Sequence, residues 1–319
     1  MEQYLPEGCL WNTPENTASL KNAASLQECC KSGKILEGRV TLCDSEHNLA
    51  VDLISMKGII PKAEGAIGIA DGSTKDIALI SRVNKVVCFR ILRFEQGPDG
   101  QPVAVLSRRQ VQEECMQRYV KRLSPGDIIP VRVTHLEPFG AFVDIGCGIP
   151  SLIPIDAISV SRISHPRDRF TPGQQIRAVV RQVEPEGRVL LSHKELLGSW
   201  EENAALFSPG ETVAGIVRSC ESYGIFIELT PNLAGLAEPQ SDVFPGQHAS
   251  VFIKSLIPEK MKVKLILVDA FDAAYPAPPF RYFVEEGPLT HWRYSPACCK
   301  KTIETKFGEP ESQETITYR

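Results

Sequence analysis

The sequence predicts a mainly β protein that consists of three tandem small barrels linked by short helices. The first observation is a repeat: Phe139-Gly140-Ala141-Phe142 recurs as Tyr223-Gly224-Ile225-Phe226, and Pro125-Gly126 recurs as Pro209-Gly210. Both landmarks shift by 84 residues (223 − 139 and 209 − 125). The second observation is composition, because 23 glycines and 24 prolines in 319 residues favour short strands separated by turns. A repeated strand-and-turn unit of this length is typical of a small β-barrel.

Composition limits the class of protein. The chain is 43% hydrophobic and 23% charged, which is enough for two or three small cores. Its net charge of −4 does not indicate binding to nucleic acid over the whole surface, but it leaves room for a basic stripe on one face. The apolar runs are shorter than the roughly 20 residues that a membrane span needs. With no secretory signal visible at the amino terminus and ten scattered cysteines that fit reduced thiols, we expect a cytoplasmic protein without a membrane partner.

The first part of the chain predicts a helical segment and a degenerate repeat. Apolar residues recur at helical spacing over residues 17–32 and stop at Ser32-Gly33, so residues 1–33 form an N-terminal helical segment. Strand-like sequence then predicts a first barrel over residues 34–108. Here His47 and Ala50 stand where the later copies have aromatic residues. A copy without stacking residues is expected to be structural or to bind protein.

Two linker helices follow the first two repeats. Ser107 precedes Gln110 by three residues, and Ser192 precedes Glu195 in the same way, which is the pattern of a capping box. These starts predict linker helices over residues 109–124 and 195–208, with barrels over 125–194 and 209–269. The remaining residues, 270–319, form a C-terminal extension, and its polar, acidic end from Gly308 is predicted to be disordered.

The paired aromatic residues are the candidate binding groups. Residues three apart in a strand face opposite ways, unless the strand bends or bulges. A bend at Gly140 or Gly224 would bring both aromatics of a copy to one surface, where bases can stack. The alternative is that these rings belong to the core, but Val143 and Ile227 already supply apolar groups there. The segment from Arg162 to Lys194 contains seven basic and three acidic residues, a net charge of +4 (7 − 3).

The second copy resembles the RNA-binding repeat of the ribosomal protein S-one family, and the chain resembles a short three-repeat bacterial form of it. The resemblance rests on Gly126 to Val133, Phe139-Gly140-Ala141-Phe142-Val143-Asp144, Phe170-x-Pro172-Gly173-Gln174 and Gly187-Arg188-Val189-Leu190-Leu191-Ser192. The third copy matches over Gly210 to Val268, so the resemblance covers roughly residues 34 to 268. It implies five-stranded OB-type barrels, single-stranded RNA as the ligand, and the small ribosomal subunit or messenger RNA as partners.

Carried over residue by residue, the resemblance assigns a contact set. Phe139 and Phe142 match the family aromatics, Glu184 the acidic position and Arg188 the arginine. The family histidine falls at Pro154 in the second copy and at Glu238 in the third, which are departures from the pattern. Together with the basic residues nearby, the expected RNA-binding set is Phe139, Phe142, Arg188, Lys194, Tyr223, Phe226, Lys254, Lys260, Lys262 and Lys264.

Catalysis and cofactors receive little support from the sequence. The H-E-x-x-H, G-x-S-x-G and G-x-x-x-x-G-K-[ST] patterns do not occur, and the glycine-containing stretch Gly68 to Lys75 is interpreted as a surface loop. His291, Cys298 and Cys299 are the best metal candidate, but we expect neither metal nor cofactor. The prediction is a non-enzymatic, sequence-tolerant RNA-binding protein acting in or near translation. Two alternatives stay open: a scaffold that docks on a ribosome or an RNA-processing complex without touching RNA, and a non-catalytic fragment of a nuclease-like enzyme.

Overall fold

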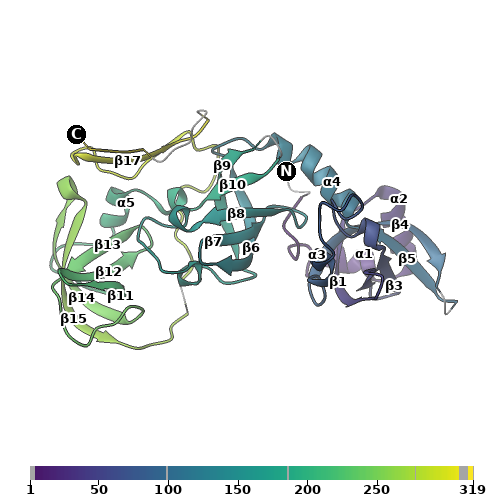
Figure 1. The fold of residues 1–319 in the computed structure, drawn as a ribbon, viewed down its shortest axis with the longest axis horizontal. Helices are drawn as coiled ribbons and strands as arrows, with labels where there is room; N and C mark the ends of the chain where they lie inside the picture. The colour runs from purple at the N-terminus through teal and green to yellow at the C-terminus, as the bar shows by residue number, and fades with distance from the viewer. Residues whose placement is uncertain (1–3, 98–99, 185–186, 277, 309–314, 319) are drawn as a thin grey trace. The chain divides into compact units, whose positions relative to one another are not determined.

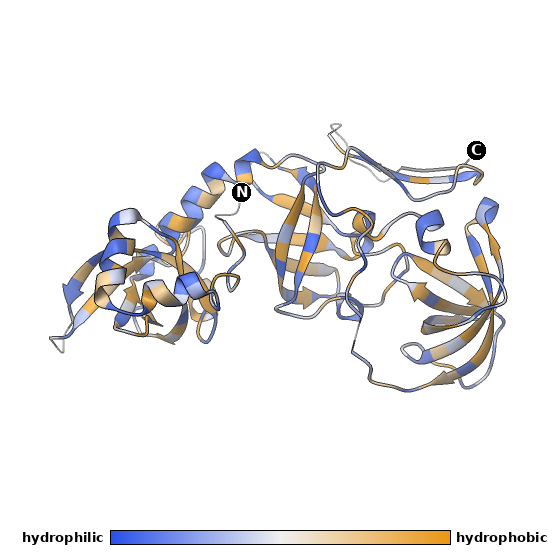
Figure 2. Cartoon of the chain, turned by 180° about the vertical axis from the view of Figure 1, so that it is seen from behind, coloured by the Kyte–Doolittle hydropathy of each residue, from blue (hydrophilic) through white to orange (hydrophobic). Residues whose placement is uncertain are grey.

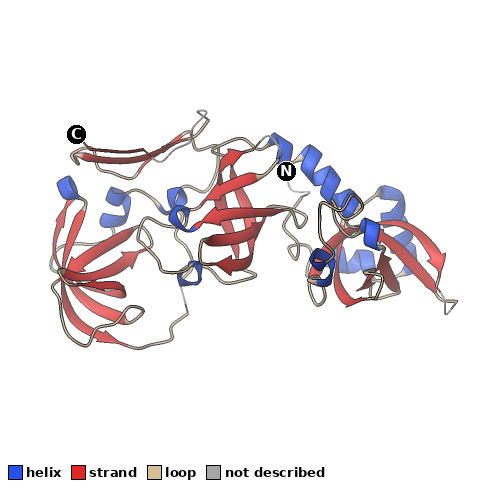
Figure 3. Cartoon of the chain, viewed as in Figure 1, coloured by secondary structure: helices blue, strands red, loops and turns tan. Residues whose placement is uncertain are grey.

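The computed structural model describes residues 1–319 apart from 1–3, 98–99, 185–186, 277, 309–314 and 319. Strands dominate, and they form three closed five-stranded barrels followed by a three-stranded sheet (Figure 3). The chain divides into two compact units. The first contains Met1–Leu123, Pro130–Arg132 and Asp144–Pro150, and the second contains Ser124–Ile129, Val133–Val143 and Ser151–Arg319. The predicted class, mainly β with three tandem OB-type barrels, is confirmed.

The first barrel has the strand order β1-β2-β3-β5-β4 (Figure 1). Its strands are β1 (Leu36–Cys43), β2 (Leu49–Asp52), β3 (Lys57–Ile60), β4 (Val86–Gln96) and β5 (Pro102–Ser107). All neighbours are antiparallel except β3 and β5, which pair in parallel and close the barrel. Phe89 lies fully buried in its core. The helical elements of this part are α1 (Pro14–Leu20), α2 (Ala23–Ser32), η1 (Lys62–Glu64), α3 (Ile77–Ile80), α4 (Arg109–Arg118) and η2 (Val120–Arg122).

The second and third barrels repeat this plan. The second contains β6 (Ile128–Glu137), β7 (Gly140–Asp144), β8 (Pro150–Pro154), β9 (Gln175–Val183) and β10 (Val189–Ser192) in the order β10-β8-β7-β6-β9. The third contains β11 (Thr212–Glu221), β12 (Gly224–Thr230), β13 (Leu233–Ala237), β14 (His248–Ile257) and β15 (Lys262–Phe271) in the order β11-β12-β13-β15-β14. The short helical elements here are η3 (Ile155–Ala157), η4 (Pro166–Asp168), η5 (Lys194–Leu197), α5 (Trp200–Ala204) and η6 (Pro258–Lys260).

Alternating burial explains why these segments form strands. In β13, for example, Leu233, Gly235 and Ala237 are buried while Ala234 and Leu236 are partly exposed. This alternation is the period of a strand that has one face on a core, and Figure 2 shows apolar and polar residues interspersed along the barrel strands. A β-bulge interrupts β1 between Val40 and Leu42, and β11 between Val217 and Ser219. Bulges increase strand twist, which helps a short sheet to close.

Three local predictions differ from the structure. The helix expected over residues 17–32 is two helices, because Asn22 caps α2 in a reciprocal pair with Ser25. The linker helix expected over 195–208 is reduced to η5 and α5, and the complete capping box of α5 is Ser199 with Glu202 rather than Ser192 with Glu195. Gly198, whose φ of 83° is not helical, separates η5 from α5.

The C-terminal extension contains more regular structure than the sequence suggested. Strands β16 (His291–Arg293), β17 (Lys301–Lys306) and β18 (Thr315–Tyr318) form a sheet in that order. Disorder was predicted from Gly308, yet β18 pairs antiparallel with β17, since Thr-Ile-Thr-Tyr is a strand-forming sequence. Residues 309–314 and 319 of the predicted disordered end lie outside the described residues. Trp292 of β16 joins the hydrophobic core of the third barrel.

Candidate nucleic-acid interface

Two aromatic rings stand together on the second barrel. Phe139 lies in the turn between β6 and β7 and is 56% exposed, while Phe142 lies in β7 and is half-buried. Their ring centroids are 5.9 Å apart at an interplanar angle of 85°, an edge-to-face contact. This geometry leaves Phe139 open to solvent and supports it from one side, which suits a ring on which a base can stack.

The third barrel repeats the pair in the same geometry. Tyr223, in the turn between β11 and β12, is 66% exposed, and its ring centroid lies 6.1 Å from that of half-buried Phe226 at 87°. Phe226 pairs in register with Leu236 on β13, and Leu236 pairs with Lys264 on β15. Two strand spacings therefore separate Phe226 from Lys264, about 10 Å. An aromatic group and a basic group thus occupy one row across the outer face.

The physical reason for the shared face is not the glycine bend that the sequence suggested. Phe139 and Tyr223 lie in hairpin turns, so strand alternation does not apply to them. The glycines are needed for another reason: a Cβ on Gly140 would approach the Ile153 carbonyl oxygen to 2.5 Å, and one on Gly224 would approach that of Ala237 to 2.7 Å. Gly140 and Gly224 therefore allow the next strand to come close beneath the aromatic pair.

A third ring, which the sequence did not point to, extends the platform of the second barrel. His135 is exposed on β6, and its imidazole stacks on Phe142 with centroids 4.3 Å apart and an interplanar angle of 9°. The 84-residue offset makes Ser219 of the third barrel the counterpart of His135. Ser219 pairs in register with Phe226. That offset was the available signal, because it puts a histidine beside Phe142 on the neighbouring strand.

The basic residues of the third barrel are exposed. Lys254 lies on β14, Lys260 in the turn η6, and Lys262 and Lys264 on β15. Met261 has a φ of 48° and closes the tight turn between the two strands. Three of the four lysines therefore lie at or beside one hairpin end, and Lys264 continues the row that begins at Phe226. This is a positive stripe on a chain whose net charge is negative.

Strand pairing relates Arg188 of the second barrel to Lys262 of the third. The parallel pair that closes the second barrel is Leu152 with Leu190, and that of the third is Leu236 with Lys264. Arg188 and Lys262 each stand two residues before the β10 or β15 partner. Arg188 is exposed. Strand register therefore makes Arg188 and Lys262 equivalent positions of the two barrels.

Burial removes Lys194 from the proposed contact set. Its side chain is 3% exposed, and its Nζ donates to the Asp156 carbonyl oxygen at 3.2 Å. Arg169, another member of the basic run, is buried in an ion pair with Glu228. A charge run in sequence is therefore partly internal in this fold, and the net of +4 overstates the charge that an RNA would meet.

The positions of the family histidine carry no donor toward the platform. Pro154 is the half-buried last residue of β8. Glu238 is exposed directly after β13. A carboxylate there repels phosphates, so the lysines on β14 and β15 have to outweigh it. In the second barrel, His135 supplies an imidazole from a different strand.

The first barrel lacks the platform. Ala50 pairs with Ile59, and Ile59 pairs in parallel with Val105, so this row is the counterpart of Phe226, Leu236 and Lys264. His47, in a left-handed turn with φ 64°, lies 3.7 Å from Asp76 through its Nδ1. An aliphatic row offers no aromatic ring to a base and no cation to a phosphate.

The acidic residue of the repeated motif has a structural role. Asp144 is buried and accepts hydrogen bonds from the backbone N–H groups of Glu7 (2.7 Å), Gly146 (2.8 Å) and Gly148 (3.0 Å). Burial, together with the negative charge of Glu7, raises the pKa of Asp144 to about 7. Burial would also raise the pKa of Glu7, but the ion pair with Arg108 (2.6 Å) holds it below its ordinary value.

Other candidate chemistry is not assembled in the described residues. His291 contacts Glu304 at 3.1 Å, Cys298 is exposed and Cys299 is buried. Across the described ranges, no three His, Cys, Asp or Glu side chains come together in a way that could hold a metal ion. No helix in that same part of the chain is both long and apolar enough to cross a membrane.

Comparison with known proteins agrees with this geometry. The S1 RNA binding domain family matches residues 122–194. Small ribosomal subunit protein bS1 of Staphylococcus aureus (strain COL) is 27% identical over 262 residues, which is 77% of this chain and 64% of that protein. The bS1 protein of Rhizobium meliloti (strain 1021) is 27% identical over 242 residues, or 69% of this chain and 42% of that protein. The aligned part thus spans less than two thirds of the length of these curated relatives.

A solved structure from Streptococcus pneumoniae, a multidomain protein with nucleic acid binding domains, is 14% identical, covers 74% of each chain and has a TM-score of 0.25. A likeness of this size adds nothing to the fold, which rests on the strand pairing. The S1 family is defined by RNA binding and the relatives are named as ribosomal proteins, so neither is an enzyme family. The second barrel thus matches the S1 RNA binding domain family, and the chain is similar to bS1 over most of its length.

Proposed function

We propose that this protein binds single-stranded RNA through the outer faces of its second and third barrels, with little sequence specificity. The observation that carries the proposal is the repeated aromatic pair: an exposed ring in a hairpin turn, supported edge-on by a ring on the next strand, in both barrels. Every base has a π-face, so stacking is tolerant of sequence. The basic groups at equivalent positions, Arg188 and Lys262, supply the phosphate contacts.

The expected strength follows from the number of rings. Each base stacked on an aromatic side chain contributes about 1–3 kcal/mol, so replacing one exposed ring should weaken binding about 5- to 150-fold. Each phosphate contact that is lost should reduce the slope of log affinity against log salt by about 0.7. The two barrels are joined covalently, so their affinities combine through an effective concentration.

The test is fluorescence anisotropy with a labelled single-stranded RNA of about a dozen nucleotides, at low and moderate salt. One sample carries Phe139→Ala, Tyr223→Ala and Arg188→Ala together. The matched control carries Phe244→Ala and Arg122→Ala, which remove an exposed ring and an exposed cation outside the aromatic row. Loss of binding in the first variant and retention in the control supports the face. Equal affinity of both variants would contradict it.

We further propose that the RNA is messenger RNA and that the protein acts in the cytoplasm, in or near translation, without catalysing a reaction. This proposal is supported by the name of the relatives, small ribosomal subunit protein bS1. Its test is sedimentation with purified small ribosomal subunits, with and without a messenger RNA. Co-sedimentation that the triple variant loses indicates attachment through RNA.

A scaffold function remains the second candidate, and the aliphatic row of Ala50, Ile59 and Val105 on the first barrel favours it for that barrel. Sedimentation with the subunits that the triple variant retains would indicate docking through protein surfaces instead.

A further inference from the structure

The second barrel holds a peptide segment by its backbone. The N–H of Glu7 donates to Oδ2 of Asp144 at 2.7 Å, and the carbonyl oxygen of Glu7 accepts from Nη1 of Arg132 at 3.0 Å. One acid and one arginine on adjacent strands therefore grip the donor and the acceptor of a single residue. We call this arrangement, Arg132 with Asp144, the backbone clamp. Such contacts recognise backbone groups, so they do not depend on a particular side chain.

The first barrel carries the same two residue types at the same positions. In the third barrel, Ile216 pairs with Glu228. The 84-residue offset makes Arg132 and Asp144 the equivalent residues of the second barrel. In the first barrel, Arg39 pairs with Asp52, and Asp52 stands two residues after Ala50 just as Glu228 stands two after Phe226. The bulge also follows in both strands at the same distance from these residues. Arg39 and Asp52 are thus the counterparts of the clamp.

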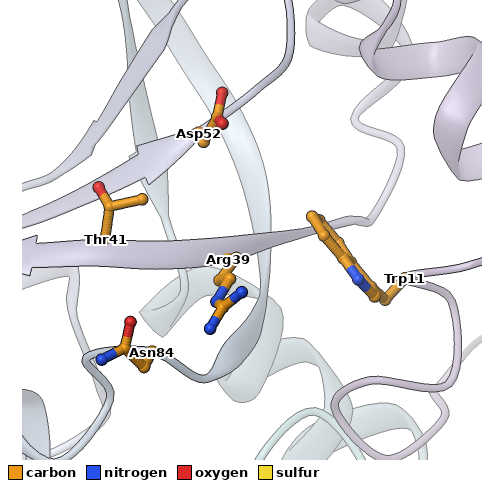
Figure 4. Close-up of a pocket in the computed structure, with 5 residues that line it drawn as sticks. All are labelled: Trp11, Arg39, Thr41, Asp52 and Asn84. Atoms are coloured by element: carbon orange, nitrogen blue, oxygen red, sulfur yellow. The ribbon is translucent and has the colours of Figure 1, made fainter.

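This second pair is open to solvent. Arg39 and Asp52 are exposed, and they line a pocket of about 470 Å³ together with Trp11, Thr41 and Asn84. Figure 4 shows Trp11 on a separate loop beside the strand of Arg39 and Thr41, with Asp52 on the neighbouring strand. Oδ1 of Asp52 accepts from the N–H of Ile54 at 3.0 Å, which fixes the carboxylate and leaves Oδ2 for another donor. Within the described part of the chain, no hydrogen bond or ion pair joins the Arg39 guanidinium to another residue.

We propose that this pocket binds an extended peptide segment of a partner protein. Asp52 accepts the N–H of one residue of the segment, and Arg39 donates to the carbonyl oxygen of the same residue. The half-buried indole of Trp11 forms an aromatic wall for a neighbouring proline or aliphatic side chain. The segment held in the second barrel has this character, since buried Pro6 precedes Glu7.

Charge favours a peptide over RNA as the occupant. Asp52 repels a phosphate and so opposes its attraction to Arg39, whereas a peptide bond offers one donor to Asp52 and one acceptor to Arg39. The row beside the pocket is aliphatic, so a bound nucleotide finds no continuing platform. The proposal does not depend on RNA binding by the other two barrels.

The probe is a synthetic capped peptide with the sequence of Tyr4–Leu10, carrying serine in place of Cys9, because the equivalent clamp holds this segment. Binding is followed by NMR on the full chain through the indole N–H signals of its three tryptophans. Trp11→Phe identifies the Trp11 signal, and the buried Trp200 and Trp292 serve as internal references. We expect the peptide, at millimolar concentration, to shift the Trp11 signal alone.

Two matched changes test the clamp from both sides. Arg39→Ala, compared with Arg122→Ala, should weaken binding about 10- to 100-fold, because a hydrogen bond to a charged group is removed. A peptide that is N-methylated at its glutamate lacks the N–H for Asp52 and should weaken by a similar factor. No Trp11 shift, or equal binding of the methylated peptide, would overturn the proposal. So would a shift caused by the dodecamer RNA and lost in Arg39→Ala, which would identify a nucleotide site.

Discussion

The buried ion pair between Arg169 and Glu228 leads to an unusual prediction: a second substitution should rescue the first. Both side chains are nearly inaccessible, at 3% and 6% exposure. Glu228 also accepts two hydrogen bonds from Arg218, through Nε at 2.8 Å and Nη2 at 3.2 Å. The other contacts of Arg169 are neutral, with the Ser159 hydroxyl and the Asp168 carbonyl, both at 3.3 Å. The carboxylate therefore has a second hydrogen-bonded cation, whereas Glu228 is the one carboxylate that hydrogen-bonds Arg169 among the described residues.

This asymmetry determines the magnitudes. Glu228→Gln leaves the Arg169 guanidinium buried without a counter-charge, and breaking a buried pair in this way costs about 3–5 kcal/mol. Arg169→Met keeps the aliphatic stem and leaves Glu228 with Arg218, so a smaller loss of about 1.5–3 kcal/mol is expected from the lost charged hydrogen bond. Burial lowers the pKa of Arg169, because removal from water disfavours the charged guanidinium. Combining the two substitutions removes the stranded charge, and the double variant should regain about 1–3 kcal/mol relative to Glu228→Gln.

Urea unfolding followed by tryptophan fluorescence measures these differences. Trp200 and Trp292 both lie in the core of the third barrel, so they report the unit that contains the ion pair. A Trp11→Phe background removes the signal of the first unit. Midpoints at constant m-value give the change in the free energy of unfolding. A double variant less stable than Glu228→Gln alone would refute the reasoning, and so would a larger loss from Arg169→Met than from Glu228→Gln.

Three further outcomes are expected. His135→Ala should weaken RNA binding by about 1 kcal/mol, or roughly fivefold, because it removes the ring stacked on Phe142, and anisotropy with the same dodecamer would measure it. Lys264→Ala should lower affinity and reduce the salt slope by about 0.7, whereas Lys194→Met should leave both unchanged, since its Nζ is buried on Asp156. Burial raises the pKa of Glu37 to about 7, so the folded state binds more protons than the unfolded state between pH 4.5 and 7. The free energy of unfolding should therefore fall by about 2 kcal/mol from pH 5.5 to 8, and Glu37→Gln should lack this part of the dependence.

The barrels were predictable because their information is local and repeated. Alternating apolar residues define the strands, and the 84-residue offset aligns two copies without ambiguity. The exposure of the rings at positions 139 and 223 was also predicted, although the glycine bend given as its reason was wrong. Each ring lies in a hairpin turn, and the sequence alone does not show where that turn ends and the next strand begins.

The fate of the basic residues depends on contacts that sequence does not display. Arg169 and Lys194 lie in a run that looks like a solvated face. Folding places Arg169 against an acid 59 residues away and buries the Lys194 ammonium against a backbone carbonyl. Pairing partners at such separation leave no local pattern. The position of Arg188, by contrast, was predictable, because it directly precedes the last strand of its barrel, as Lys262 begins the last strand of the third barrel.

The acidic residue at the end of the repeated motif has a different set of contacts in each of the three barrels. At this position Asp144 binds the backbone of Glu7, Glu228 binds two arginines, and Asp52 is exposed beside Arg39. The position lies next to the aromatic row but is not itself required for stacking. It can therefore hold chain segments together and leave the row free for the RNA binding that we propose. In the first barrel the row is aliphatic, and no such segment is bound to the acid in the described residues. A barrel in that condition is better suited to holding a peptide than to holding RNA.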